Sequence, residues 1–531
     1  MTLTAIILSG LMFSCLDTSI VSTALVTISV QLGESQDAPW AILGYLLTYM
    51  SFAVGFSKLS DIYGRKNLLA IAWVLFSGFS IMCAAATSMR QLIAARALQG
   101  IGGSGLYSLA QVCLVEQGPN RPEIVGALVG ITLSISYVLG PLLGGALSAW
   151  TWRAIFWINV PFGTLAVVGI YTLWPEERRN KYGVRAAFSR IDFVGNILLV
   201  VASILLVFAV QQGGSFVWKW SSPVIVSSLV ISGISWIVLG AWETHLYNGK
   251  GRPVQPIFPL HLATGRVYLS SFIVTFLTGF IYIALVIKIP ERLQIIYGDN
   301  AFGAGIHLLP MLGPCAFGSF LGGVISKRKN LTSQTLVVGT SLQLIGIGLV
   351  YGFTSPSRES NMVFLLGFEA IYGLGVGLCF AASTIIAAIE ARNDDLAAAQ
   401  GAVAQARVFG GALGLSVCTI IFNEFSQAAL GPGSGSGLSA SDLDQIHRSP
   451  MALLNLAVDL QLKVKEVYLG AFREQMLAMT VVAVVAVLVS FGTHRPNPTP
   501  VTQILIQHKE VAGRSSDTEL ESADSVRSLV R

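Results

Sequence analysis

Long apolar runs separated by short polar connections cover nearly the whole chain. A helix that crosses a bilayer needs about 20 mostly apolar residues, because its backbone polar groups must be satisfied within the helix. The sequence contains about fourteen such runs. They lie at residues 3–30, 40–58, 68–89, 92–115, 124–149, 153–174, 191–212, 221–242, 267–289, 301–326, 334–354, 362–388, 397–424 and 475–492. The pattern predicts an all-α polytopic membrane protein with one transmembrane helix for each run.

The connections between these runs differ in their content of lysine and arginine. Most basic residues lie in the connections after every second run, above all in the polar segment 175–190. Basic residues are enriched on the cytoplasmic side of membrane proteins. We therefore predict that both termini are cytoplasmic and that the long connection 425–474 is an outer loop, in which Leu453–Tyr468 has the pattern of an amphipathic helix. The tail 493–531 is too poor in apolar residues to fold, so we expect a disordered cytoplasmic segment.

The composition agrees with a membrane protein and excludes several functions. Of the 531 residues, 53% are hydrophobic and 11% are charged, whereas about 25% are charged in a soluble domain. A soluble enzyme is therefore excluded, and no basic stripe suggests a nucleic-acid partner. The six cysteines all lie within apolar runs, and the six histidines are too scattered for a metal or haem site. We expect no metal, no cofactor and no enzymatic activity.

Four charged residues interrupt the apolar runs. They are Asp17, Arg96, Glu369 and Arg407. A charge at bilayer depth costs about 2.5–3.5 kcal/mol on insertion scales, so each must face protein or water. Removal from water favours the neutral form of a carboxyl group, which lets a buried Asp or Glu take up and release a proton. The alternative is an internal ion pair or hydrogen bond that only holds the helices together.

Two further segments combine glycines with polar or kinking residues. In Gly55–Lys66, Asp61 can pair with Arg65 beside Lys66, while Gly55 and Gly64 allow a turn and close helix contacts. A solvated cytoplasmic loop would explain the basic residues but not the aspartate and the glycines.

The fifth run contains the second of these segments, Gly140-Pro141-Leu142-Leu143-Gly144-Gly145. Pro141 removes a backbone donor, which predicts a bend, and Gly140, Gly144 and Gly145 leave a bare helix surface. Such a surface allows another part of the protein to close on it. The alternative is an ordinary kinked and tightly packed transmembrane helix.

These segments resemble the signatures of the major facilitator superfamily, in particular its fourteen-helix drug:proton antiporter branch as found in fungi. Gly55–Lys66 resembles the signature between the second and third helices, Leu16–Val21 that of the first helix, and Arg96–Gly100 that of the fourth. Gly140–Gly145 resembles the antiporter signature, and Ile158–Gly163 also matches the branch. The similarity is dense in the N-terminal half and looser in the C-terminal half.

The resemblance implies a major facilitator fold and a set of site residues. The implied parts are a six-helix bundle at 1–174, cytoplasmic linkers with two inserted helices at 175–265, a second six-helix bundle at 266–492, and the tail. Proton coupling is assigned to Asp17, Arg96 and Glu369, and the substrate cavity between the bundles to Tyr282, Tyr372 and Gln99. Gly55, Asp61, Gly64, Arg65 and Lys66 form a conformational latch, and Gly140, Pro141, Gly144 and Gly145 form the antiporter motif.

The function implied by this resemblance is proton-coupled efflux of small amphipathic organic compounds, such as drugs, toxins or secondary metabolites, by alternating access. One alternative is a nutrient or siderophore facilitator or symporter of the same fold. The other, from a different functional class, is a non-transporting membrane sensor. We expect a monomer in the lipid bilayer that binds cargo and protons. The plasma membrane is the expected location, with the vacuolar membrane as the alternative.

Overall fold

The computed structural model describes residues 2–32, 39–117, 122–174, 192–213, 218–249, 254, 256–258, 260–299, 301–326, 330–354, 362–391, 395–430, 457–496, 498 and 500. Every regular element in this part of the chain is a helix. Thirteen helices of the described residues are long and apolar enough to cross a membrane. Helix α5 (Met89–Gln117) is a further 29-residue helix, and its buried polar residues explain its lower apolar content.

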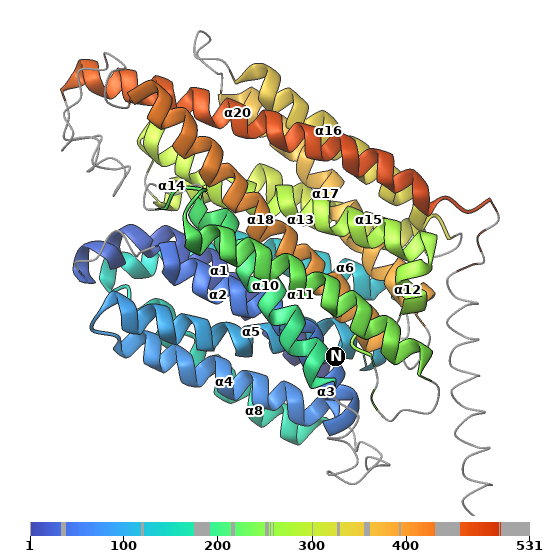
Figure 1. Ribbon diagram of the computed structural model, residues 1–531. Helices are drawn as coiled ribbons and strands as arrows, with labels where there is room; N and C mark the ends of the chain where they lie inside the picture. The colour runs from blue at the N-terminus through green and yellow to red at the C-terminus, as the bar shows by residue number, and fades with distance from the viewer. Residues whose placement is uncertain are drawn as a thin grey trace, which may run out of the picture.

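The helices form two packed halves (Figure 1). The N-terminal half contains α1 (Thr2–Leu32), α2 (Pro39–Ser51), α3 (Ala53–Tyr63), α4 (Arg65–Ala85), α5, α6 (Pro122–Trp150), α7 (Ala154–Trp157) and α8 (Asn159–Leu173). The C-terminal half contains α13 (Arg266–Arg292), the π-helical segment η2 (Leu293–Tyr297), α14 (Ala301–His307), α15 (Leu309–Ser326), α16 (Thr332–Phe353), α17 (Met362–Glu390), α18 (Leu396–Leu430), α20 (Val458–Ser490) and the 3₁₀ segment η5 (Phe491–Thr493).

The two halves meet along two seams. Helix α6 packs against α14, α15 and α17, while α18 packs against α2, α3 and α5. Side chains from both halves belong to one continuous apolar core, in which Cys15 and Tyr49 lie with Ile283 and Phe380. A site built on these seams is therefore sensitive to any movement of one half against the other.

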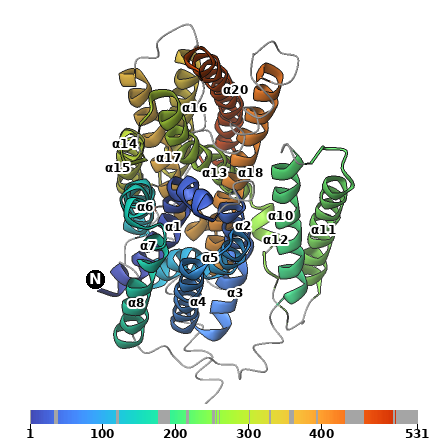
Figure 2. The ribbon, with the colours of Figure 1, turned by 90° about the vertical axis from the view of Figure 1, so that its left-hand side faces the viewer.

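Two helices that lie between the halves in the sequence belong to neither bundle. They are α10 (Phe193–Gly213) and α11 (Pro223–Asn248), which pair with each other at the side of the molecule (Figure 2). Helix α10 packs against α2 and α18, and the short α12 (Leu260–Thr264) leads from this pair to α13. Much of α11 presents apolar side chains to the surroundings, as expected for a helix that faces lipid.

Several helix boundaries differ from those expected from the sequence. The segment Gly55–Tyr63 is helical within α3, so the turn before α4 is reduced to Gly64, whose φ of 88° is accessible to glycine at little cost. At the other end, Val458–Ser490 is one uninterrupted helix. The helix expected at Leu453–Tyr468 is therefore not separate, because its part from Val458 forms the first turns of this helix. The loop predicted up to residue 474 was wrong there, because charged residues lower hydropathy without breaking a helix. Residues 431–456 of that loop, and the tail from 501, lie outside the described part.

Candidate functional site

A network of buried polar side chains surrounds Asp17 in the N-terminal half. The Arg96 guanidinium forms an ion pair with Asp17 Oδ2. Asp17 Oδ1 accepts hydrogen bonds from Gln99 Nε2 at 3.2 Å and Asn159 Nδ2 at 3.1 Å. Both amides also donate to Ser80 Oγ, at 2.7 and 3.1 Å. We call these five residues the Asp17 network.

The network joins four helices at one point. Asp17 comes from α1, Ser80 from α4, Arg96 and Gln99 from α5, and Asn159 from the first turn of α8. All five side chains are at most 1% exposed. Ionised groups that are removed from water are tolerated when they are paired and hydrogen-bonded, as Asp17 is here. A change in the charge of Asp17 would therefore alter the contacts that join these four helices.

Helix α2 completes the environment of the Arg96 guanidinium. Arg96 Nε donates to the carbonyl oxygen of Ala41 at 3.1 Å, and Nη1 donates to Gln99 Oε1 at 2.7 Å. The guanidinium lies over the ring of Tyr45, 4.2 Å from its centroid. A cation over an aromatic face adds an attraction that strengthens in a dry site. The protein thus holds Arg96 in place with groups besides its carboxylate partner.

Glu369 lies apart from this network, in the C-terminal half. It is buried on α17, and neither carboxylate oxygen has a hydrogen-bond partner in the part of the chain that the structure describes. The basic residue that acts on it electrostatically is Arg292 of α13, whose guanidinium also lies 4.5 Å from the ring of Phe472. The three residues expected to couple protons are thus divided: Asp17 and Arg96 are paired, and Glu369 is elsewhere.

The three residues expected to line a substrate cavity also lie at three different places in the structure. Tyr282 of α13 lies where the halves meet, with its ring edge-on to Tyr137 of α6 at 5.6 Å and to Phe380 of α17 at 5.3 Å. Tyr372 is buried within the C-terminal half, where its backbone lies against α16. Gln99 belongs to the Asp17 network rather than to the tyrosines.

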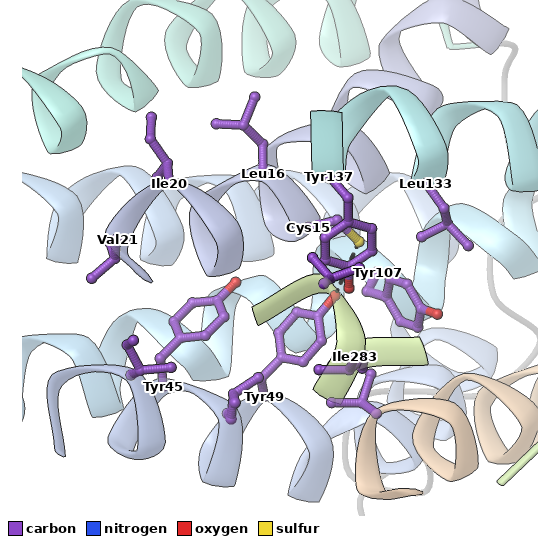
Figure 3. Close-up of a cluster of buried hydrophobic side chains, with 14 of the residues drawn as sticks. Cys15, Leu16, Ile20, Val21, Tyr45, Tyr49, Tyr107, Leu133, Tyr137 and Ile283 are labelled. Atoms are coloured by element: carbon purple, nitrogen blue, oxygen red, sulfur yellow. Dashed lines mark hydrogen bonds between the residues drawn. The ribbon is translucent and has the colours of Figure 1, made fainter. Parts of the chain in front are cut away.

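Aromatic side chains of both halves converge around Tyr282. We call Tyr49, Tyr107, Tyr137, Tyr282 and Phe380 the central aromatic cluster. Tyr49 and Tyr107 lie 5.5 Å apart, and the Tyr49 hydroxyl is 3.7 Å from the sulfur of Cys15. Figure 3 shows the hydroxyls of Tyr49 and Tyr137 beside this cysteine and that of Tyr107 turned away from it, with Ile283 of α13 close by. This is the place where flat apolar faces and phenol hydroxyls of the two halves come together.

Arg407 of α18 reaches this cluster from the C-terminal half. Its Nη1 donates to the hydroxyl of Tyr107 at 3.1 Å, and its guanidinium lies 4.3 Å from the centroid of Phe380. The sequence showed Arg407 as a charge within an apolar run and as part of the looser family match of the C-terminal half, and it gave no role to Tyr107 or Asn159. Their partners come from other helices, so no pattern along one helix could identify them.

The expected latch lies at the predicted cytoplasmic end of the seam between α3 and α18. The Arg65 guanidinium donates to Ser60 Oγ, and Lys66 Nζ donates to the carbonyl oxygen of Tyr171 at 3.4 Å. Lys58 lies 4.0 Å from Asp395, the residue before α18. The side chain of Asp61 is outside the described part. Among the latch residues, Gly55 packs against Asn196 of α10, which ties the inserted pair to this end.

The expected antiporter motif lies on α6, which contacts both halves. A side chain at Gly140 would overlap Ser19 of α1, so this glycine allows α1 and α6 to approach closely. The ring of Pro141 packs against Gly305 of α14 in the other half. Pro141, Gly144 and Gly145 all lie within the continuous helix α6. The motif thus links the helix that carries Asp17 to the C-terminal half.

Comparison with known proteins gives matches over most of the chain. The family model described as Major Facilitator Superfamily matches residues 7–415. The MFS-type transporter FPY5 of Fusarium mangiferae is 36% identical over 500 residues, which cover 92% of this chain and 82% of that protein. Multidrug resistance protein 3 of Bacillus subtilis is 28% identical, with 85% of this chain and 88% of that protein covered. The vacuolar membrane amino acid uptake transporter fnx2 of Schizosaccharomyces pombe is also 28% identical, with 85% and 78% covered.

Solved structures agree with this assignment at the level of the fold. A bacterial homologue of the human lysosomal transporter Spinster, in an inward-facing and unoccupied conformation, has a TM-score of 0.57 at 14% sequence identity. The match covers 95% of this chain and 97% of that protein. The family match, the relatives and the helical architecture lead to one conclusion. The chain belongs to the Major Facilitator Superfamily and is an integral membrane transporter rather than an enzyme.

Proposed function

We propose that the protein exports small amphipathic organic molecules in exchange for protons by alternating access of its two halves. The single observation that supports this most is the Asp17 network, a fully buried carboxylate held by Arg96, Gln99 and Asn159. Such a group is costly to keep in a membrane protein and is typical of proton pathways. Several relatives are named as efflux or multidrug resistance proteins, which favours export.

Protonation of Asp17 would act on the helices through its hydrogen bonds. The ionised carboxylate accepts two amide N–H groups and pairs with Arg96. A neutral carboxyl attracts these donors less, so α1 is held less firmly against α4, α5 and α8. Ser19 lies two residues after Asp17 on α1 and packs against Gly140 of α6. Helix α6 in turn packs against α15. This gives a path of packed helices from the proton site to the seam between the halves.

The central aromatic cluster is the proposed cargo site. Tyrosines suit amphipathic molecules because each offers a flat apolar face and a polar hydroxyl. Tyr282 and Phe380 come from the C-terminal half, and Tyr49, Tyr107 and Tyr137 from the N-terminal half. Cargo bound between them would be exposed to opposite sides of the membrane as the halves move. We further propose that the transporter acts as a monomer and resides in the plasma membrane.

Purified protein in sealed vesicles tests the proposal. With a proton gradient imposed, a fluorescent amphipathic dye should move against its concentration gradient, and a protonophore should abolish this movement. Asp17→Asn should lose gradient-driven transport while it keeps its membrane insertion. Gradient-driven transport in Asp17→Asn would place the proton site elsewhere. Uptake of cargo in the same direction as protons would support the alternative of a nutrient or siderophore symporter.

A second candidate function comes from the relative named as a vacuolar membrane amino acid uptake transporter. The same vesicles can be supplied with a mixture of amino acids in place of the dye. Proton-driven movement of amino acids without movement of the dye would favour this function. It would also favour the vacuolar membrane over the plasma membrane as the location.

A further inference from the structure

We propose that Arg407 and the central aromatic cluster bind the anionic group of an amphipathic cargo, so that the preferred cargo is an organic anion with a flat aromatic or apolar body. This inference rests on the proposed transport function and names its cargo class. It is carried by the surroundings of Arg407, which differ from those of the other buried arginine of this region, Arg96.

The two arginines have different partners. Arg96 has a carboxylate partner in Asp17, a backbone carbonyl and an amide oxygen. Arg407 is 3% exposed and donates to one neutral group, the hydroxyl of Tyr107. Its Nε and Nη2 have no hydrogen-bond partner among the described residues. Arginine stays protonated in proteins, so this is a buried cation without a bound counter-charge there.

Other buried polar groups lie around the same point. Gln111 is one helical turn from Tyr107 on α5, is fully buried, and interacts with the Tyr107 hydroxyl that Arg407 also contacts. The Tyr282 hydroxyl is buried beside the sulfur of Cys315. Both Tyr282 and Arg407 pack on the ring of Phe380. Buried polar groups are normally satisfied, so the two guanidinium nitrogens of Arg407 that have no partner among the described residues indicate a place for a polar ligand.

The geometry of these groups suits an anion. The planar guanidinium presents two free N–H directions, which match the two oxygens of a carboxylate or sulfonate. Gln111 and Tyr282 add donors of hydrogen bonds. The rings of Phe380 and Tyr282 provide flat apolar faces for the body of the molecule. A neutral or cationic cargo would leave the Arg407 charge uncompensated.

The groups also come from both halves. Tyr107 and Gln111 lie on α5, whereas Arg407 lies on α18 and Phe380 on α17. An anion bound here therefore contacts both halves, as a cargo site for alternating access requires. The partners of Asp17 are Arg96, Gln99 and Asn159, so the anion at Arg407 does not compete with the proton for the same side chains.

A matched pair of probes tests the proposal by equilibrium dialysis of the full chain in nanodiscs, with empty nanodiscs subtracted. The probes are 2-naphthoate and 2-naphthamide, which share the ring and differ in the charge. We expect the wild-type protein to bind the carboxylate at least about tenfold more tightly, as for a charge-assisted bidentate contact. Arg407→Gln should reduce this preference to less than about twofold. Arg473→Gln is the matched control, because it removes an arginine that lies over Tyr351 of the same half.

A second measurement covers the case in which Arg407→Gln does not fold. In the wild-type protein, 2-naphthoate should raise the thermal midpoint of unfolding in a concentration-dependent manner, and 2-naphthamide at equal concentration should not. Equal affinities for the two probes, no binding of either, or a preference that survives in Arg407→Gln would overturn the proposal. Because no proton gradient is used, this failure is distinct from a failure of proton-coupled efflux, which is measured in sealed vesicles.

Discussion

Replacing Asn159 by leucine removes one contact of the Asp17 carboxylate without touching either member of the ion pair. Asn159 Nδ2 donates to Asp17 Oδ1 and to Ser80 Oγ, both at 3.1 Å. A hydrogen bond to a charged group contributes about 1.5–3 kcal/mol. Its loss weakens the ionised form of Asp17 relative to the neutral form by this amount. Since 1.36 kcal/mol corresponds to one pH unit, the midpoint of proton-driven transport should move to higher pH by about 1–2 units.

The assay is the initial rate of dye transport in proteoliposomes as a function of pH on the side that releases protons. Thr164→Val is the control, because Thr164 lies on the same helix, is exposed, and its hydroxyl bonds to the backbone of its own helix at Val160. This variant should keep the wild-type pH profile. A folded Asn159→Leu protein with an unchanged midpoint would refute the reasoning, because it would show that the Asp17 network does not set the pH dependence of transport.

Three further substitutions examine other parts of the structure. Glu369→Gln should lower the thermal midpoint, because it removes the buried carboxyl that acts electrostatically on the buried Arg292; a higher midpoint would contradict this. Gly140→Leu should destabilise the protein by about 1–3 kcal/mol and impair transport, because the new side chain overlaps Ser19, whereas Gly367→Ala, with open space around it, should do neither. Arg65→Ala should change the maximal transport rate while the half-saturating dye concentration changes less than about twofold, and a pure affinity effect would argue against a latch.

The sequence predicts the helices well because lipid imposes a strong constraint on them. Apolar runs of sufficient length are required wherever the backbone crosses hydrocarbon, so the described helices follow the predicted runs. The predicted boundaries were wrong where a helix continues beyond its apolar run. Charged residues in the first turns of Val458–Ser490 lower the hydropathy there, and the polar residues of Gly55–Tyr63 predict a connection although this segment is helical.

The candidate site was predictable only in part. A charge within an apolar run is visible in the sequence, and this identified Asp17, Arg96 and Arg407 as unusual. Which charges meet depends on the packing of several helices. Gln99 was therefore assigned to a cavity, although it faces Asp17. Asn159 carries no charge and stood out only as part of a family signature, so its contact with the same carboxylate could not be predicted.

The separation of the Asp17 network from Arg407 leads to a prediction about charge movement. If one organic anion leaves for each proton that enters, two equivalents of positive charge move inward per cycle, whereas a neutral cargo moves one. A charge that crosses the membrane gains about 2.3 kcal/mol per 100 mV. A potential that is negative on the side from which cargo leaves should therefore accelerate export of 2-naphthoate about twice as steeply, on a logarithmic scale, as export of 2-naphthamide. Potassium gradients with valinomycin in proteoliposomes set the potential at a fixed pH gradient. An equal dependence for the two probes would show that the anionic charge is not carried through the site at Arg407.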